Sequence, residues 1–252
     1  MSIPKLVAHR GYATRFPENT LLSIGEALQA GARFVEFDVQ CTADGIPVVF
    51  HDRSLERTTG IQKNLLELPS EKIRNISACE TTRFGKQFTD QNITIPSLAQ
   101  VVSLLKKWPQ TTAFVEIKEE SLTKFGNTAV LKTVMACIAP ILKQCCVISY
   151  NDLALRAARE LGAQTIGWVL KSWSNQCHDT AKNLMPDYLI CNYKKIPKAS
   201  TPLWSGPWQW CLYEITDPKL ALKLHARGAD LIETMDIVGM FSGLRLTAKR
   251  AI

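Results

Sequence analysis

Short apolar runs alternate with stretches of helical periodicity along almost the whole chain. The apolar runs predict strands at 6–9, 34–40, 47–52, 113–118, 146–150, 165–170, 188–193, 210–215 and 230–235. Apolar residues at helical spacing predict helices at 18–31, 97–108, 127–144, 152–163, 174–185 and 217–228. This alternation, with short connections, indicates parallel strands joined by crossover helices.

So many strand–helix repeats in 252 residues favour a TIM-like (β/α)8 barrel over a doubly wound sheet. The sequence offers nine candidate strands, whereas a (β/α)8 barrel has eight. The connection from 38 to 47 is too short for a crossover helix, so we expect the extra segment there, as a hairpin or a barrel unit without its helix. Residues 53–95 are polar and irregular, which predicts a small insertion on an early βα loop. We expect a single domain over residues 1–252.

Composition narrows the class of protein. An apolar fraction of 46% and a charged fraction of 21% are ordinary for a globular protein. No apolar run approaches the roughly 20 residues of a membrane span, and the segment MSIPKLVAHRG lacks the features of a signal peptide. We therefore expect a cytoplasmic protein without stable membrane insertion. The eight cysteines are scattered without CxxC spacing, which favours free thiols.

The formal charge of +7 favours anionic partners. The excess is spread along the chain, however, and no helix-turn-helix or RNP pattern supports nucleic-acid binding. A phosphorylated small molecule is the simpler expectation.

Acidic side chains stand near the ends of two expected strands, FVEFDVQ and AFVEIK. Two-residue spacing places Glu36 and Asp38 on one face of their strand, and in a barrel Glu116 would face the same mouth. Three carboxylates converge only if a cation neutralises them, and all-oxygen ligands select Mg²⁺ or Ca²⁺. The alternative is that they are solvated charges at strand ends.

Two histidines and two cations have the same placement. His9 and His51 close apolar runs and could exchange protons at neutral pH, although either one alone would be more safely interpreted as a structural histidine. Arg10 and Lys118 could hold a phosphate, the first as a planar fork and the second as a point charge. Surface ion pairs with nearby carboxylates are the alternative.

The ordered motifs HRG, PENT, EFDV, DGIPVVFHD, TTG and EIK resemble the glycerophosphodiester phosphodiesterase family, in its bacterial cytosolic form. The resemblance covers nearly the whole chain and is strongest over 7–60 and 113–118. It implies a TIM-like barrel with an insertion at 53–95 and one bound Mg²⁺ or Ca²⁺. It also implies site roles: metal ligands Glu36, Asp38 and Glu116, an acid–base pair His9 and His51, and phosphate-binding Arg10 and Lys118.

The implied reaction is hydrolysis of a glycerophosphodiester to sn-glycerol 3-phosphate and an alcohol. In one route the substrate's neighbouring glycerol hydroxyl, polarised by the bound cation, loses its proton to one histidine and attacks phosphorus. The other histidine protonates the leaving alcohol, and water then opens the cyclic phosphate. Direct attack by water is the alternative, and the sequence does not choose between them.

Two departures from the family pattern concern the pocket wall. Tyr213 stands where the family commonly has a tryptophan that stacks on glycerol, so we expect Tyr213 to bind substrate. The last strand ends Glu233-Thr234-Met235, where the family often shows Thr-Asp. Two alternative functions follow. One is a lysophospholipase D acting on lipids through the insertion and a loop at 194–209 with Trp204; the other is a non-catalytic barrel that binds phosphorylated ligands.

Overall fold

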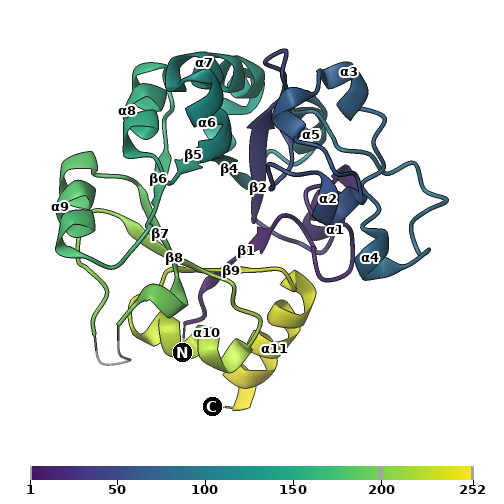
Figure 1. Ribbon diagram of the computed structural model, residues 1–252. Coiled ribbons are helices and arrows are strands. Elements are labelled where there is room, and N and C mark those ends of the chain that lie inside the picture. The colour runs from purple at the N-terminus through teal and green to yellow at the C-terminus, as the bar shows by residue number, and fades with distance from the viewer. Residues whose placement is uncertain (1, 198–200, 251–252) are drawn as a thin grey trace.

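The computed structural model describes residues 2–197 and 201–250, and within them nine strands form one continuous sheet (Figure 1). Eight run parallel and close into a barrel, because β1 pairs with both β9 and β2. This confirms the predicted TIM-like barrel. The barrel strands are β1 (Lys5–His9), β2 (Phe34–Cys41), β4 (Thr112–Ile117), β5 (Cys145–Ser149), β6 (Ile166–Val169), β7 (Tyr188–Asn192), β8 (Gln209–Tyr213) and β9 (Leu231–Thr234).

The ninth strand lies outside the barrel. Strand β3 (Pro47–Val49) pairs antiparallel with β2, with Val39 opposite Val49. The turn between them contains Gly45 at a positive φ of 77°, a conformation that glycine adopts without steric cost. Of the two alternatives left open for the extra segment, the hairpin is therefore the correct one.

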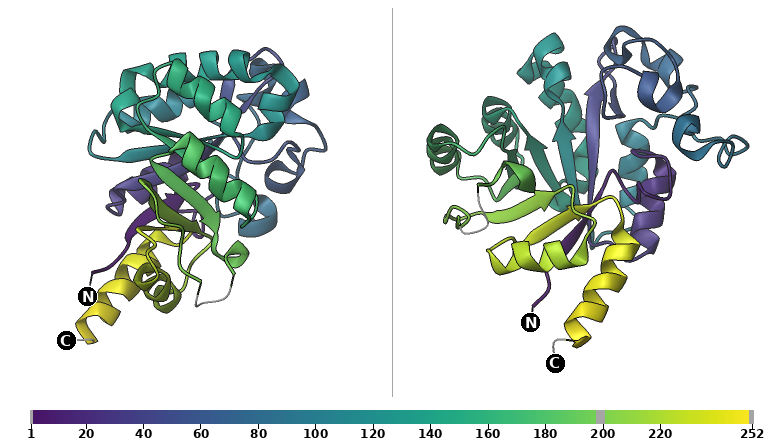
Figure 2. Two further views of the ribbon diagram at one scale, coloured as in Figure 1. Left: turned by 90° about the vertical axis from the view of Figure 1, so that its left-hand side faces the viewer. Right: turned by 60° about the horizontal axis from the view of Figure 1, so that its bottom comes forward.

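Helices surround the barrel on all sides (Figures 1 and 2). The crossover helices lie close to their predicted positions, and α6 and α11 are additional to the prediction. The helices outside the insertion are α1 (Leu21–Gln29), α5 (Leu98–Leu105), α6 (Glu119–Phe125), α7 (Asn127–Ile138), α8 (Asp152–Glu160), α9 (Asn175–Leu184), α10 (Pro218–Ala226) and α11 (Ile237–Arg250), with short 3-10 turns η2 (Ala139–Gln144) and η3 (Tyr193–Lys195).

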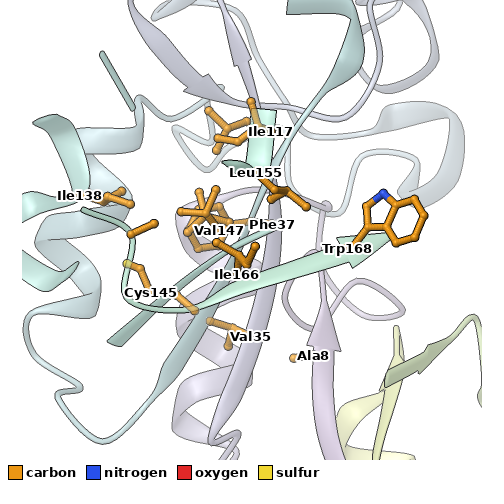
Figure 3. Packing of buried hydrophobic residues seen from close by; sticks show 14 of the residues in the cluster. Ala8, Val35, Phe37, Ile117, Ile138, Cys145, Val147, Leu155, Ile166 and Trp168 are labelled. Carbon is orange, nitrogen blue, oxygen red and sulfur yellow. The ribbon is translucent and has the colours of Figure 1, made fainter. Parts of the chain in front are cut away.

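The main hydrophobic core lies between the barrel and its helices. Alternate strand residues point outward, such as Val35 of β2, Val147 of β5 and Ile166 of β6, and helix residues such as Ile138 and Leu155 belong to the same buried cluster (Figure 3). Side chains that point inward fill the lower barrel: Val7, Phe114, Cys146, Ile148, Val169, Ile190, Cys211 and Leu231. The barrel is therefore solid below its carboxyl-terminal mouth, as expected for this architecture.

Residues 53–95 form the predicted insertion, beside α1 (Figure 1). They contain four short helical segments: α2 (Glu56–Thr59), η1 (Leu65–Glu67), α3 (Ser70–Ile73) and α4 (Thr81–Phe84). The insertion has a small buried cluster of its own, which includes Leu55, Leu65 and Ile73 together with Val48 and Phe50 of the β3 segment. It is thus packed against the hairpin that carries His51.

The described cysteines are all unbridged, as predicted. Within the residues that the structure describes, no helix has both the length and the apolar character needed to cross a bilayer.

Candidate active site

Strand register brings the predicted acidic residues together. His9 of β1 lies opposite Glu36 of β2, and Asp38 of β2 lies opposite Glu116 of β4. All four side chains are on inward-facing positions near the carboxyl ends of parallel strands, where active sites of this fold occur. Oxygen atoms of the three carboxylates lie within 4.8 Å of one another. The alternative of separate, solvated strand-end charges is therefore wrong.

The HRG motif forms a tight, left-handed turn after β1. Arg10 and Gly11 have φ values of 54° and 81°. A Cβ atom on Gly11 would lie 2.4 Å from the backbone carbon of Ser23, so only glycine fits against the start of α1. The turn directs the Arg10 amide toward Glu36, and this N–H donates a hydrogen bond of 3.1 Å to Glu36 Oε2.

The PENT motif has three local roles, one for each polar residue. Thr20 is the N-cap of α1 and accepts a hydrogen bond from the Ser23 amide, so the helix begins at Leu21. Asn19, at φ 56°, donates to Asp38 Oδ2 at 2.8 Å and accepts from the Asp38 amide at 3.1 Å. Glu18 lies before the helix, and its carboxylate receives a hydrogen bond of 2.8 Å from Arg10 Nη1.

Two largely buried cations lie among the carboxylates. Lys118 Nζ is 3.2 Å from Asp38 Oδ1 and 2.9 Å from Glu116 Oε1. Arg10 Nε is 3.3 Å from Asp38 Oδ2. Burial opposes the charge of Asp38, but Lys118 and Arg10 outweigh it and hold the pKa of this carboxyl well below its usual range. Both cations are thus ion-paired, inside the site rather than on the surface.

The other two carboxyl groups of the cluster are less well compensated. Burial, reinforced by the charges of Asp38 and Glu233, raises the pKa of Glu36 well above its ordinary value. Burial and the charge of Asp38 also raise the pKa of Glu116, although Lys118 opposes this. In the absence of a further cation, these two groups therefore resist ionisation.

The cluster fits a divalent cation. Glu36 Oε1 is buried and has no hydrogen-bond partner among the described residues. An orphaned carboxylate oxygen beside two more carboxylates is a set of hard oxygen donors, which suits Mg²⁺ or Ca²⁺. Glu36, Asp38 and Glu116 are the residues that would hold it, and a bound cation would also favour their ionised forms.

The two candidate histidines differ in environment. His9 is buried, and burial together with the charge of Arg10 lowers its pKa to about 3. Its Nε2 lies 3.8 Å from Glu36 Oε2 and 3.4 Å from Glu233 Oε1. His51 follows β3 and so enters from the hairpin rather than from a barrel strand. It is 31% exposed, and its Nδ1 is 2.5 Å from Asp52 Oδ1.

The sequence places Glu233 at the pocket wall but predicts no role for it in the chemistry. It is buried on β9, beside His9, and burial and the charges of Glu116 and Asp38 raise its pKa to about 8. The only sequence signal is a charged residue inside the apolar run LIET. That run is distant from β1 in sequence, and the two strands become neighbours only through barrel closure.

Tyr213 is near the site, as expected. Its ring centroid is 6.5 Å from that of His9, and its hydroxyl lies 2.8 Å from that of Tyr150, the residue after β5. Burial raises the pKa of the Tyr213 hydroxyl far above its ordinary value. The phenol is therefore neutral and can present a ring face and a hydrogen bond to a ligand. Its role in substrate binding remains a prediction.

The tryptophans of the 194–209 loop are engaged in packing. Residues 198–200 of this loop lie outside the described part of the chain. The Trp204 ring is tilted against that of Trp173, with 4.2 Å between the ring centroids, and it stacks on the His178 ring at 4.7 Å. The indole N–H groups of Trp208 and Trp210 both donate to the Trp204 carbonyl oxygen. This cluster therefore consolidates the wall of helices and loops outside the barrel.

Comparison with known families assigns the chain to one of them. The model of the glycerophosphoryl diester phosphodiesterase family matches residues 9–175. The chain belongs to this family. The matched segment of the family begins at His9 and contains each of the predicted metal ligands, both histidines and both cations, whereas Tyr213 and Glu233 lie beyond it.

Sequence relatives match over less than half of the chain. Human glycerophosphodiester phosphodiesterase 1 is 40% identical over 97 residues, which are 38% of this chain and 29% of the human protein. A glycerophosphodiester phosphodiesterase of Caldanaerobacter subterraneus is 36% identical over 100 residues, 40% of each chain. The chain thus spans well under two thirds of the length of these family members.

Solved structures of similar fold match over nearly the full length. A phosphodiesterase from Oleispira antarctica, solved in complex with sn-glycerol-3-phosphate, superposes with a TM-score of 0.82 and 24% identity, covering 96% of this chain and 97% of that one. A putative glycerophosphoryl diester phosphodiesterase from Silicibacter pomeroyi superposes with a TM-score of 0.83 and 19% identity. The superposition covers 98% of this chain and 94% of that one. At this identity the similarity establishes the barrel fold of the family.

Proposed function

We propose that this chain is a metal-dependent glycerophosphodiester phosphodiesterase. It would hydrolyse a small glycerophosphodiester to sn-glycerol 3-phosphate and an alcohol. The observation that carries the proposal is the convergence of three carboxylates, two cations and a histidine at the carboxyl-terminal mouth of the barrel. The names of the family relatives and the product bound to the Oleispira antarctica enzyme support this substrate class.

Glu36, Asp38 and Glu116 would hold one Mg²⁺ or Ca²⁺, which supplies positive charge for the phosphoryl oxygens. Arg10 and Lys118 would contact the same phosphate. Despite their burial, neighbouring carboxylates hold the pKa of both above the ordinary value, so both stay charged. Their ion pairs with Asp38 keep them at the mouth, where a phosphate would share their charge.

The histidines would divide the proton transfers. Burial and the charge of Arg10 lower the pKa of His9, so its ring is neutral near pH 7, and an unprotonated ring nitrogen would take the proton of the substrate's neighbouring hydroxyl. The hydroxyl oxygen forms a bond to phosphorus, the bond from phosphorus to the alcohol oxygen breaks, and His51 gives that oxygen a proton. Because Nδ1 of His51 is hydrogen-bonded to Asp52, the other ring nitrogen, Nε2, is available to give this proton. Water then opens the cyclic phosphate with the roles reversed.

The route makes a distinct prediction about substrates. A diester without the free neighbouring hydroxyl cannot form the cyclic phosphate and is not cleaved. Cleavage of such a compound at a comparable rate would favour direct attack by water, with the same products from ordinary substrates.

Release of glycerol 3-phosphate from glycerophosphocholine and glycerophosphoethanolamine tests the activity, with Mg²⁺, Ca²⁺ or EDTA. We expect metal-dependent release that is lost in His51→Ala and Glu116→Gln, while Glu160→Gln, an exposed carboxylate on α8, behaves as the wild type. His51→Ala should still bind the metal, and Glu116→Gln should bind it more weakly in calorimetry. Unchanged metal affinity in Glu116→Gln would contradict the ligand assignment.

Long-chain lysophospholipids belong in the same assay. Preference for them would establish the lysophospholipase D alternative, and absence of release from every diester would favour a phosphate-binding barrel without turnover. The single domain, cytoplasmic location and absence of nucleic-acid partners stay predictions from the sequence.

A further inference from the structure

Arg57 links the insertion to the mouth of the barrel. It belongs to the four-residue helix α2, and its side chain is 46% exposed. All three guanidinium nitrogens are engaged with carboxylates. Nε donates to Asp52 Oδ2 at 2.5 Å, while Nη2 and Nη1 donate to Glu18 Oε1 and Oε2 at 2.6 and 3.1 Å. The planar fork thus bridges two carboxylates that come from different parts of the sequence.

Each of these carboxylates holds one residue of the proposed reaction. Asp52 contacts His51 Nδ1 through its other oxygen, and Glu18 accepts a hydrogen bond from Arg10 Nη1. The five side chains therefore form one continuous chain of charged contacts, with Arg57 at its centre. One end is the expected proton donor and the other is an expected phosphate ligand.

The position of Arg57 at the centre of this chain affects the orientation of the groups at both ends. His51 is 31% exposed and is held by one carboxylate, so its orientation depends on how firmly Asp52 is fixed. Glu18 is only 3% exposed, and its charge persists because Arg57 and Arg10 together outweigh the cost of burial and lower its pKa. Removing the guanidinium leaves both carboxylates short of a partner and free to move their own partners.

We propose that Arg57 is a positioning residue for the reaction, which orients His51 through Asp52 and Arg10 through Glu18. The proposal rests on the proposed phosphodiesterase function. The insertion thereby contributes to turnover although none of its side chains needs to touch the substrate.

Arg83 provides a comparison within the same insertion. It pairs with Glu80 at 2.8 Å and lies 3.8 Å from Glu18, but within the described part of the chain it forms no hydrogen bond or ion pair with Asp52. If the arginines only anchor the insertion, loss of either one should lower stability without a selective effect on turnover. If Arg57 positions the site, its loss alone should reduce kcat.

The experiment compares Arg57→Ala, Arg57→Lys and Arg83→Ala in the full chain, with glycerophosphocholine and saturating Mg²⁺, at a temperature where circular dichroism shows each folded. We expect kcat to fall about 10- to 100-fold in both Arg57 variants, because small displacements of reacting groups cost this much. KM should also rise in both. Lysine keeps the charge but not the fork, so Arg57→Lys tests geometry even if Arg57→Ala fails to fold.

Added guanidinium chloride gives a readout that anchoring alone would not move. At millimolar concentration it should restore part of the kcat of Arg57→Ala and leave Arg83→Ala unchanged. A kcat within about twofold of the wild type in folded Arg57→Lys, or equal losses in the Arg57 and Arg83 alanine variants without rescue, would overturn the positioning role. A wild-type protein without activity would instead refute the proposed function.

Discussion

Replacement of Glu233 by glutamine is expected to stabilise the metal-free protein at neutral pH. Glu233 is 3% exposed and is surrounded by other acids, so its pKa rises from 4.5 to about 8 on folding. Between these values the folded state retains a proton that the unfolded state has released. The free energy of unfolding therefore falls as the pH rises through this window, and it levels off above the folded-state pKa.

The magnitude follows from the width of the window. With about 1.4 kcal/mol for each pH unit, the loss between pH 4.5 and pH 7 is about 3 kcal/mol. Glutamine has nearly the same shape as glutamate but no ionisable group. The free energy of unfolding of Glu233→Gln should therefore not fall between pH 4.5 and pH 7 through this residue. For a chain of this length the gain corresponds to a rise of roughly 6–12 °C in Tm.

Urea denaturation in EDTA would measure the effect, with the fluorescence of the six tryptophans as the signal. The stability advantage of Glu233→Gln should be small near pH 5 and should grow up to about pH 8. Glu160→Gln, on an exposed position of α8, is the matched control and should follow the wild type. An advantage that does not change with pH, or a less stable variant at pH 7, would refute the reasoning.

Three further outcomes can be measured by the same methods. Lys118→Met removes the cation between Asp38 and Glu116 and should cost about 3–5 kcal/mol of unfolding free energy in urea without metal. Gly11→Ala forces a Cβ into the backbone of α1 and should lower stability by at least about 2 kcal/mol, whereas Gly31→Ala, which has open space, should cost less. Mg²⁺ or Ca²⁺ at 100 times its Kd should stabilise the wild type by about 2.7 kcal/mol, and a thermal shift of equal size in Glu116→Gln would contradict the ligand set.

Most of the fold could be predicted from the hydrophobic pattern because each barrel strand is a short apolar run followed by a helix or turn signal. The ends of the helices follow less directly from this pattern. The expected helix at 18–31 begins only at Leu21, because Thr20 caps it and the residues before it are used by the site. The short helix α6 follows β4 directly, and its sequence EESLTKF lacks a clear apolar face, so it was not anticipated.

The site residues that could be predicted share one property: they stand at the ends of apolar runs. Glu36, Asp38, Glu116 and His9 were placed together correctly because parallel strands share one carboxyl-terminal edge. The place of Glu18 in the site could not be predicted, since neither its partner Arg57 nor the closeness of the insertion can be deduced from local pattern.

The electrostatics of the site lead to one last conclusion. The barrel mouth largely buries four carboxyl groups beside two permanently charged cations: Glu36, Asp38, Glu116 and Glu233 beside Arg10 and Lys118. Full ionisation leaves an excess of two negative charges, which one divalent cation would neutralise. Without it, the excess is relieved by protonation, as the raised pKa values of Glu36, Glu116 and Glu233 indicate. Metal binding should therefore release protons, and the unliganded site should be a local weak point in an otherwise well-packed barrel.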